Sequence, residues 1–183
     1  MSESAAAPHT DVVLLRGVNV NGLTVRSAAL RASMLAVDGV RAARTLLASG
    51  NVVITTDRPA SEVKREAEQR LRADFGYDAR VVVVDQAELA GVLVATPYRD
   101  DDPDRHVYLT FCSDPGLLDE VERDAPEGAD WARAASGVLA WTCAVGASTI
   151  DPMAKFLAKA RYRTSTTTRN LRTVIRLSTL DPT

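Results

Sequence analysis

The chain has little of the residue types that usually mark a metal or redox centre: two cysteines and two histidines in 183 residues. Cys112 and Cys143 each end an apolar, strand-like run, which is typical of small core side chains. Neither has a histidine near it that could complete a zinc site. With His9 and His106 as its two histidines, the chain does not indicate histidine-based catalysis. The sequence therefore predicts no metal and no cofactor, and it identifies no catalytic residue, which leaves open whether the protein is an enzyme.

Long hydrophobic runs and an excess of one charge are also absent. No apolar run approaches the roughly 20 residues of a membrane span, and Met1 to Asp11 lacks the basic start and hydrophobic centre of a signal peptide. A net charge of -2 and a pI of about 5.7 give no overall attraction to nucleic acid or anionic membranes. These features predict a cytoplasmic globular protein with no membrane partner, preceded by a disordered tail over residues 1–10.

The first half of the chain alternates between the periodicity of strands and that of helices. Thr24 and Ser61 are placed to cap the two helices, and Gly76 is placed to end the second. The expected elements are a strand at 12–15, a helix from Thr24 to about Gly39, a strand at 42–47, a strand at 52–56, a helix from Ser61 to Gly76 and a strand at 79–84. This β-α-β-β-α-β order is the ferredoxin-like split β-α-β arrangement.

The second half begins with the same pattern and then departs from it. The expected elements are a helix opened by Asp85 and ended before Pro97, a strand at 107–112, a short helix at 115–123, a hairpin of 130–133 with 138–143, and helices at 152–162 and 170–180 separated by a Ser/Thr run. We therefore expect an α+β fold of two tandem ferredoxin-like units with antiparallel sheets. The units are predicted at 11–85 and 86–183, and the second is atypical and ends in a basic helical segment.

Two polar motifs stand directly against apolar runs in the first third of the chain. Leu14 to Gly22 holds an arginine, two asparagines and two glycines, and Ser49-Gly50-Asn51 precedes an apolar strand. In the split arrangement, the loop after the first strand and the turn between the second and third strands lie at the same end of the sheet. The sequence thus predicts a binding corner formed by Arg16, Asn19, Asn21, Gly22, Ser49, Gly50 and Asn51.

An anion is the ligand that the residues of this corner suit best. Arginine presents a fixed fork of donors to a carboxylate or phosphate, and the start of the first helix adds unpaired N–H groups. The alternative is that asparagine and glycine only stabilise turns, while Arg16 pairs with a carboxylate of the protein itself. The same two alternatives, binding an anion or stabilising local structure, apply to Thr168-Arg169-Asn170, which precedes the last expected helix. Thr168 or Asn170 can cap that helix, but Arg169 there opposes the helix dipole unless an anion lies between.

These three motifs resemble those of a bacterial family catalogued as domain of unknown function 1697. The resemblance rests on Leu15 to Val20, Ser49 to Val53, and Thr168-Arg169-Asn170 with Thr173-Val174, in the same order and spacing. It implies a tandem of two ferredoxin-like units, and it implies no activity because the family has none assigned. The chain departs from the family pattern at Asn21, Leu23, Ala48 and Leu171-Arg172, where the family usually has glycine, lysine, glutamine and Trp-Asn.

Charge is uneven in the second half. Residues 99–130 contain eleven acidic and three basic residues, whereas residues 152–180 contain seven basic residues and no acidic one. The basic segment either folds back over the acidic loops or forms a surface for phosphates. Alternative functions are therefore a nucleic-acid or nucleotide-associated protein that uses Lys155 to Arg176, or an assembly module without catalysis. The first expected sheet lacks the aromatic residues on central strands with which such sheets stack RNA bases.

Overall fold

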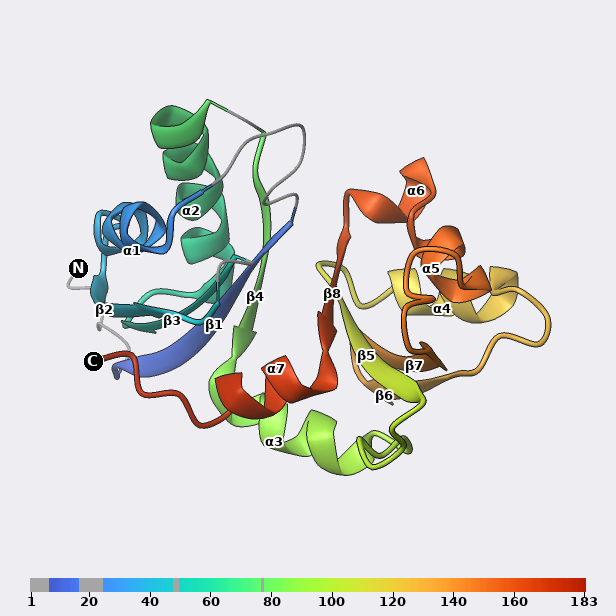
Figure 1. The fold of residues 1–183 in the computed structure, drawn as a ribbon. Helices are drawn as coiled ribbons and strands as arrows, with labels where there is room; N and C mark the ends of the chain where they lie inside the picture. Colours follow the sequence, from blue (N-terminus) through green and yellow to red (C-terminus); the bar gives the residue numbers. More distant parts are fainter. Residues whose placement is uncertain (1–6, 17–24, 48–49, 77) are drawn as a thin grey trace. The chain divides into compact units, whose positions relative to one another are not determined.

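The computed structural model describes residues 7–16, 25–47, 50–76 and 78–183 (Figure 1). The chain divides into two compact units, one made of Met1–Glu88 with Thr179–Thr183 and the other of Leu89–Ser178. Each unit contains a four-stranded antiparallel sheet. The predicted α+β class with two antiparallel ferredoxin-like sheets is confirmed. Among the described residues, no helix combines the length and the apolar character that crossing a bilayer requires.

The first unit has the predicted β-α-β-β-α-β order. Its elements are β1 (His9–Arg16), α1 (Ser27–Leu35), β2 (Val40–Thr45), β3 (Asn51–Thr56), α2 (Ala60–Phe75) and β4 (Arg80–Asp85), followed by α3 (Gln86–Ala95), which leads into the second unit. The strand order is β2-β3-β1-β4, so β1 and β3 are central and β2 and β4 are edge strands. β1 begins at His9, inside the segment expected to be a disordered tail.

The helices of the first unit are fixed by apolar stripes that meet one face of the sheet. Leu30 and Met34 of α1 pack with Val63 and Leu71 of α2 in one buried cluster, which also contains Val13 of β1. Because side chains alternate along a strand, alternate residues of β1 supply this core face. The spacing of three and four residues between the apolar positions is what places them on one side of each helix.

One helix end follows its predicted chemistry and one helix start does not. Gly76 adopts a left-handed conformation with φ of 69° at the end of α2, as predicted. Ser61 does not cap this helix, because Pro59 occupies the capping position and α2 begins at Ala60. The proline ring fixes φ near the helical value, so the helix can start directly after it. Thr24 lies outside the described residues, and Arg26 precedes α1 without a side-chain capping bond.

The second unit has the same strand order as the first. Its elements after α3 are β5 (Arg105–Cys112), α4 (Leu117–Asp124), β6 (Trp131–Ala135), β7 (Val138–Ala144), α5 (Pro152–Leu157), α6 (Ala160–Arg163), β8 (Thr166–Asn170) and α7 (Leu171–Leu177). The order β6-β7-β5-β8 matches β2-β3-β1-β4 of the first sheet. The second unit departs from the first in two respects: it has two short helices, α5 and α6, before its last strand, and an added helix, α7, after it.

The sequence misplaced the end of the second unit in two ways. The expected helix at 152–162 is wrong, since α5 ends at Leu157 and α6 begins at Ala160. The Ser/Thr run has no assigned structure in the sequence pattern, but it forms edge strand β8, which pairs with β5. Threonine is β-branched and suits a pleated sheet. Its hydroxyl groups find partners only after the strand has docked. Because polar residues follow one another in this run, it lacks the apolar–polar alternation from which a strand is predicted.

The core of the second unit contains a stacked aromatic pair and a polar chain. Tyr108 of β5 and Trp141 of β7 stack with ring centroids 4.7 Å apart. The Trp141 indole N–H donates to Thr110 Oγ1 at 3.0 Å, and Thr110 Oγ1 lies 2.8 Å from Thr168 Oγ1. Both aromatic rings pack with residues of the helices, such as Leu118 of α4. They are core side chains, and they do not form a platform for bases.

The two cysteines are free thiols in this core. Cys112 pairs across the sheet with Thr166, whereas Cys143 pairs with His106 near the opposite end of β5. The two thiols therefore lie at opposite ends of the sheet. The pairing of Cys143 with His106 corrects the expectation that neither thiol has a histidine near it. Burial raises the pKa of both thiols, to about 12 for Cys112, so neither is a reactive thiolate at neutral pH.

Candidate functional site

The end of β1 and the start of β3 lie side by side. Leu14 pairs with Asn51 in the antiparallel register, and the Leu15 N–H donates to the Gly50 carbonyl at 2.8 Å. Gly50 has φ of 70°, a conformation that glycine adopts without strain. The strand ends that carry the first two motifs are therefore neighbours. Asn19, Asn21, Gly22 and Ser49, which were predicted at the same corner, lie outside the described residues.

Asn51 has a structural role in the turn between β2 and β3. Its side chain is fully buried and donates from Nδ2 to the Leu46 carbonyl at 3.0 Å. The backbone bond from the Leu46 N–H to the Asn51 carbonyl, at 2.9 Å, closes the same turn. A buried amide that satisfies a backbone carbonyl stabilises the fold. For Asn51, the turn-stabilising alternative given by the sequence thus has direct structural support.

Arg16 has a second arginine beside it. It is the last residue of β1 and pairs with Arg80, the first residue of β4. Directly opposed residues of an antiparallel pair project from the same face, so two cationic side chains leave the sheet together. Arg80 lies 3.1 Å from Asp78 and 3.9 Å from Glu68, distances that join guanidinium nitrogens to carboxylate oxygens. The sequence missed Arg80, because only the register of β4 against β1 brings it to this corner.

The third motif lies in the second unit and has three separate local roles. Thr168 belongs to the polar chain of the core, and Asn170 caps α7 by accepting from the Arg172 N–H at 2.9 Å. Arg169 donates from Nη1 to Thr167 Oγ1 and to the Thr168 carbonyl, both at 2.8 Å. Burial lowers the pKa of Arg169 to about 10, so it still carries its charge at neutral pH. Asn170 confirms the predicted cap.

Comparison with known proteins identifies the family. The family model described as "Protein of unknown function (DUF1697)" matches residues 9–136, which is more than half of the chain. The chain belongs to the DUF1697 family. The match contains the first two motifs and ends before the third, so the position of Thr168-Arg169-Asn170 within the family still rests on the resemblance of its residues.

A solved structure supports the fold of this DUF1697 protein. The conserved bacterial protein SP0830 from Streptococcus pneumoniae superimposes with a TM-score of 0.75 at 17% sequence identity, and the alignment covers 94% of this chain and 98% of that one. At this identity the likeness shows the fold alone. The comparison with curated proteins finds no match. The family and the fold are thus established, and neither carries an activity.

The basic segment of the DUF1697 chain is partly neutralised by the acidic one. Arg161 donates to Glu120 at 2.6 Å, and Arg172 donates to Asp100 at 2.5 Å. The Lys159 ammonium lies 4.8 Å from the centroid of the Phe156 ring. Basic residues from 152–180 therefore contact acidic residues from 99–130, as the first interpretation of the charge pattern expects.

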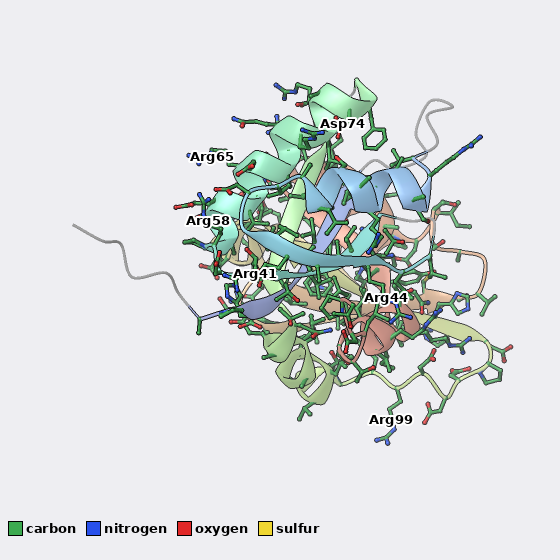
Figure 2. All side chains as sticks on the ribbon, turned by 90° about the vertical axis from the view of Figure 1, so that its left-hand side faces the viewer. Arg41, Arg44, Arg58, Arg65, Asp74 and Arg99 are labelled. Atoms are coloured by element: carbon green, nitrogen blue, oxygen red, sulfur yellow. The ribbon has the colours of Figure 1, made fainter. Side chains whose placement is uncertain are left out.

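Arginines also cover the edge strand of the first sheet. Figure 2 shows Arg41 and Arg58 at the same end of β2, with Arg65 further along α2. Arg41 forms an ion pair with Asp57, and Arg58 forms ion pairs with Asp38 and Glu62. On β2 itself, the Ala43 carbonyl accepts from Arg31 Nε at 2.7 Å. Exposed pairs of this kind contribute little to stability because water and salt screen them, so their main effect is to make this surface charged.

A buried acidic residue at the other end of β1 was not predicted. Asp11 is only 1% exposed, and its Oδ2 atom lies 3.5 Å from His9 Nε2. The available signal was a carboxylate at the start of an apolar strand, Thr-Asp-Val-Val-Leu-Leu, but the position of the strand in the sheet decides its burial. In the described part of the chain, no three acidic, histidine or cysteine side chains gather as metal ligands.

Proposed function

We propose that this DUF1697 protein binds a small ligand that bears a phosphate or carboxylate group, at the corner where β1 ends and β3 begins. The ligand-binding residues are Arg16 with the loop residues Asn19, Asn21 and Gly22, and the turn residues Ser49 and Gly50. Asn51 holds the turn in place beneath them. Arg80 joins the corner from β4.

The observation that carries this proposal is the pairing of Arg16 with Arg80. Two guanidinium groups that leave the same face of adjacent strands can hold one anion between them. Arginine supplies two parallel donors to a carboxylate or phosphate, which gives the contact direction as well as strength. The carboxylates that contact Arg80 are those of Asp78, which precedes β4, and of Glu68 on α2.

The neighbouring backbone also suits a ligand. Gly50 lies in the turn with a φ of 70°, and its buried backbone fixes the shape of the turn beside the proposed ligand. The first turn of α1 contains no acidic residue, and its capping position is held by Arg26, whose side chain makes no capping bond. Helix starts without an acidic residue favour anions, because the helix dipole is positive at that end.

The nucleic-acid alternative has less support. β1 and β3, the central strands of the first sheet, carry no aromatic residue. In the second sheet, Tyr108 and Trp141 occupy the central strands but pack under the helices, and Phe111 of β5 is buried. Single strands are bound by aromatic side chains on which bases stack, and the described central strands do not present any.

A thermal-shift titration tests the proposal. Inorganic phosphate, a nucleoside monophosphate, a sugar phosphate and a dicarboxylate are each titrated against the wild type and Arg16→Ala. A ligand that binds only the folded state stabilises it by about 2.7 kcal/mol at one hundred times its Kd. We expect at least one of these anions to stabilise the wild type with saturation, and Arg16→Ala to lose that gain.

Arg65→Ala is the matched control, since it removes the same charge from an exposed position on α2. Equal stabilisation of the wild type and both variants would mean that the anions act by general screening of charge and not at the proposed site. An absence of saturating stabilisation by any of the four anions would contradict the proposal.

A further inference from the structure

The end of the first sheet that lies away from the proposed corner holds a small group of titratable residues. Asp11 of β1 pairs directly with Asp85 of β4, so two acidic residues face each other across the strands. His9 lies two residues before Asp11 and therefore on the same face of β1. This is the face that Val13 and Leu15 present to the apolar core.

Asp11 has few partners for a buried carboxyl group. Its Oδ2 atom is buried, has no hydrogen-bond partner in the described part of the chain, and forms an ion pair with His9 Nε2 at 3.5 Å. The other ring nitrogen, His9 Nδ1, lies 3.4 Å from the Ala7 carbonyl. On β3, the residue opposite Asp11 is Ile54, which is apolar.

These surroundings favour a proton on Asp11. Burial raises its pKa to about 6, and the nearby charges of Asp85 on β4 and Glu88 on α3 act in the same direction, while His9 acts against them. The folded state therefore binds this proton more tightly than the unfolded state does. The stabilisation that follows is complete below the unfolded pKa of about 4 and is lost as the pH rises through 6.

The residues that meet Asp11 also organise the junction between β4 and α3. Asp85 Oδ1 accepts from the Ala87 N–H at 2.9 Å, and this bond caps the start of α3. The next residue, Gln86, donates from Nε2 to the Leu180 carbonyl at 2.9 Å. The chain leaves the first unit after Glu88 and re-enters it at Thr179. Asp11 therefore pairs with the residue at which β4 passes into α3, three residues before the chain leaves the first unit.

We propose that His9, Asp11 and Asp85 form a proton-operated latch at the end of the β1–β4 pair. With a proton on Asp11, the carboxyl group is neutral beside Asp85, and the β4–α3 junction is closed. Without it, two carboxylates oppose each other and the junction opens more often. The latch is independent of the proposed anion site, which lies at the opposite end of the same strands.

Hydrogen exchange of the full chain at pH 5 and pH 8 tests the latch. With a pKa near 6 in the closed form and about 4 in the open form, the opening constant of the amides at residues 85–88 should rise about tenfold between these pH values, after correction for intrinsic exchange. We expect Asp11→Asn to remove this rise, since the amide cannot ionise. Asp101→Asn, in an exposed loop, should retain it.

A carbon-13 NMR titration of the Asp11 carboxyl in the wild type gives an answer that needs no variant. We expect a midpoint near 6, and a midpoint below about 4.5, close to the value of an unperturbed aspartate, would overturn the proposal. An equal rise of the opening constant in the wild type and Asp11→Asn would also overturn it.

Discussion

Replacement of Asn51 by alanine separates the structural role of the Ser-Gly-Asn motif from its proposed binding role. The substitution removes a fully buried amide and the bond from its Nδ2 to the Leu46 carbonyl. The backbone bond from the Leu46 N–H to the carbonyl of residue 51 does not depend on the side chain. The turn should therefore still form, but with a buried carbonyl that has lost a donor.

The expected loss is about 2 kcal/mol of unfolding free energy, because a buried polar group left without its partner costs about 1–3 kcal/mol. If the whole chain unfolds in one step, this corresponds to a fall in Tm of about 4–8 °C. Asn170→Ala is the matched control in the second unit. It removes a helix cap and should cost about 1 kcal/mol.

The assay is urea denaturation followed by two signals. Circular dichroism reports both units, whereas tryptophan fluorescence reports the second, which contains both Trp131 and Trp141. If the units unfold separately, Asn51→Ala should shift only the circular dichroism transition, and Asn170→Ala should shift the fluorescence. A change of less than about 0.5 kcal/mol for Asn51→Ala would refute the account of this buried bond, since it falls below the range for a lost buried partner.

Three further outcomes follow from the described contacts. Thr110→Val should cost about 1–3 kcal/mol in urea denaturation, because it leaves the buried indole N–H of Trp141 without its acceptor; an unchanged midpoint would contradict this. Gly76→Ala should cost about 1 kcal/mol, since the strain of a positive φ remains even where there is space for a methyl group; a more stable variant would show that this end of α2 rearranges. Cys112 and Cys143 should react with a thiol reagent only after unfolding, and rapid labelling of the native protein would show that the core opens.

Local chemistry predicted most of the first unit. The apolar stripes of α1 and α2, the glycine that ends α2 and the tight turn before β3 each depend on residues close together in the sequence. The order of these elements was enough to bring the ends of β1 and β3 together. The Leu15–Gly50 bond reflects that topology.

The missed features depend on contacts between distant residues. β8 is a threonine strand that becomes recognisable only through partners such as Thr110, far away in the sequence. Arg80 joins Arg16 through the register of two strands, and Asp11 is buried because of its place in the sheet. Periodicity within one segment contains none of this information, which is why the candidate site was predicted only in outline.

The arginines of β2 have a consequence for how the protein behaves at high concentration. An edge strand offers unpaired backbone groups on which a strand from another molecule can assemble. Here Arg31 already occupies the Ala43 carbonyl, and exposed Arg41 and Arg44 bring charge to the same strand. An incoming strand would have to displace one guanidinium group and desolvate two others. This edge is therefore a poor template for a strand from another molecule.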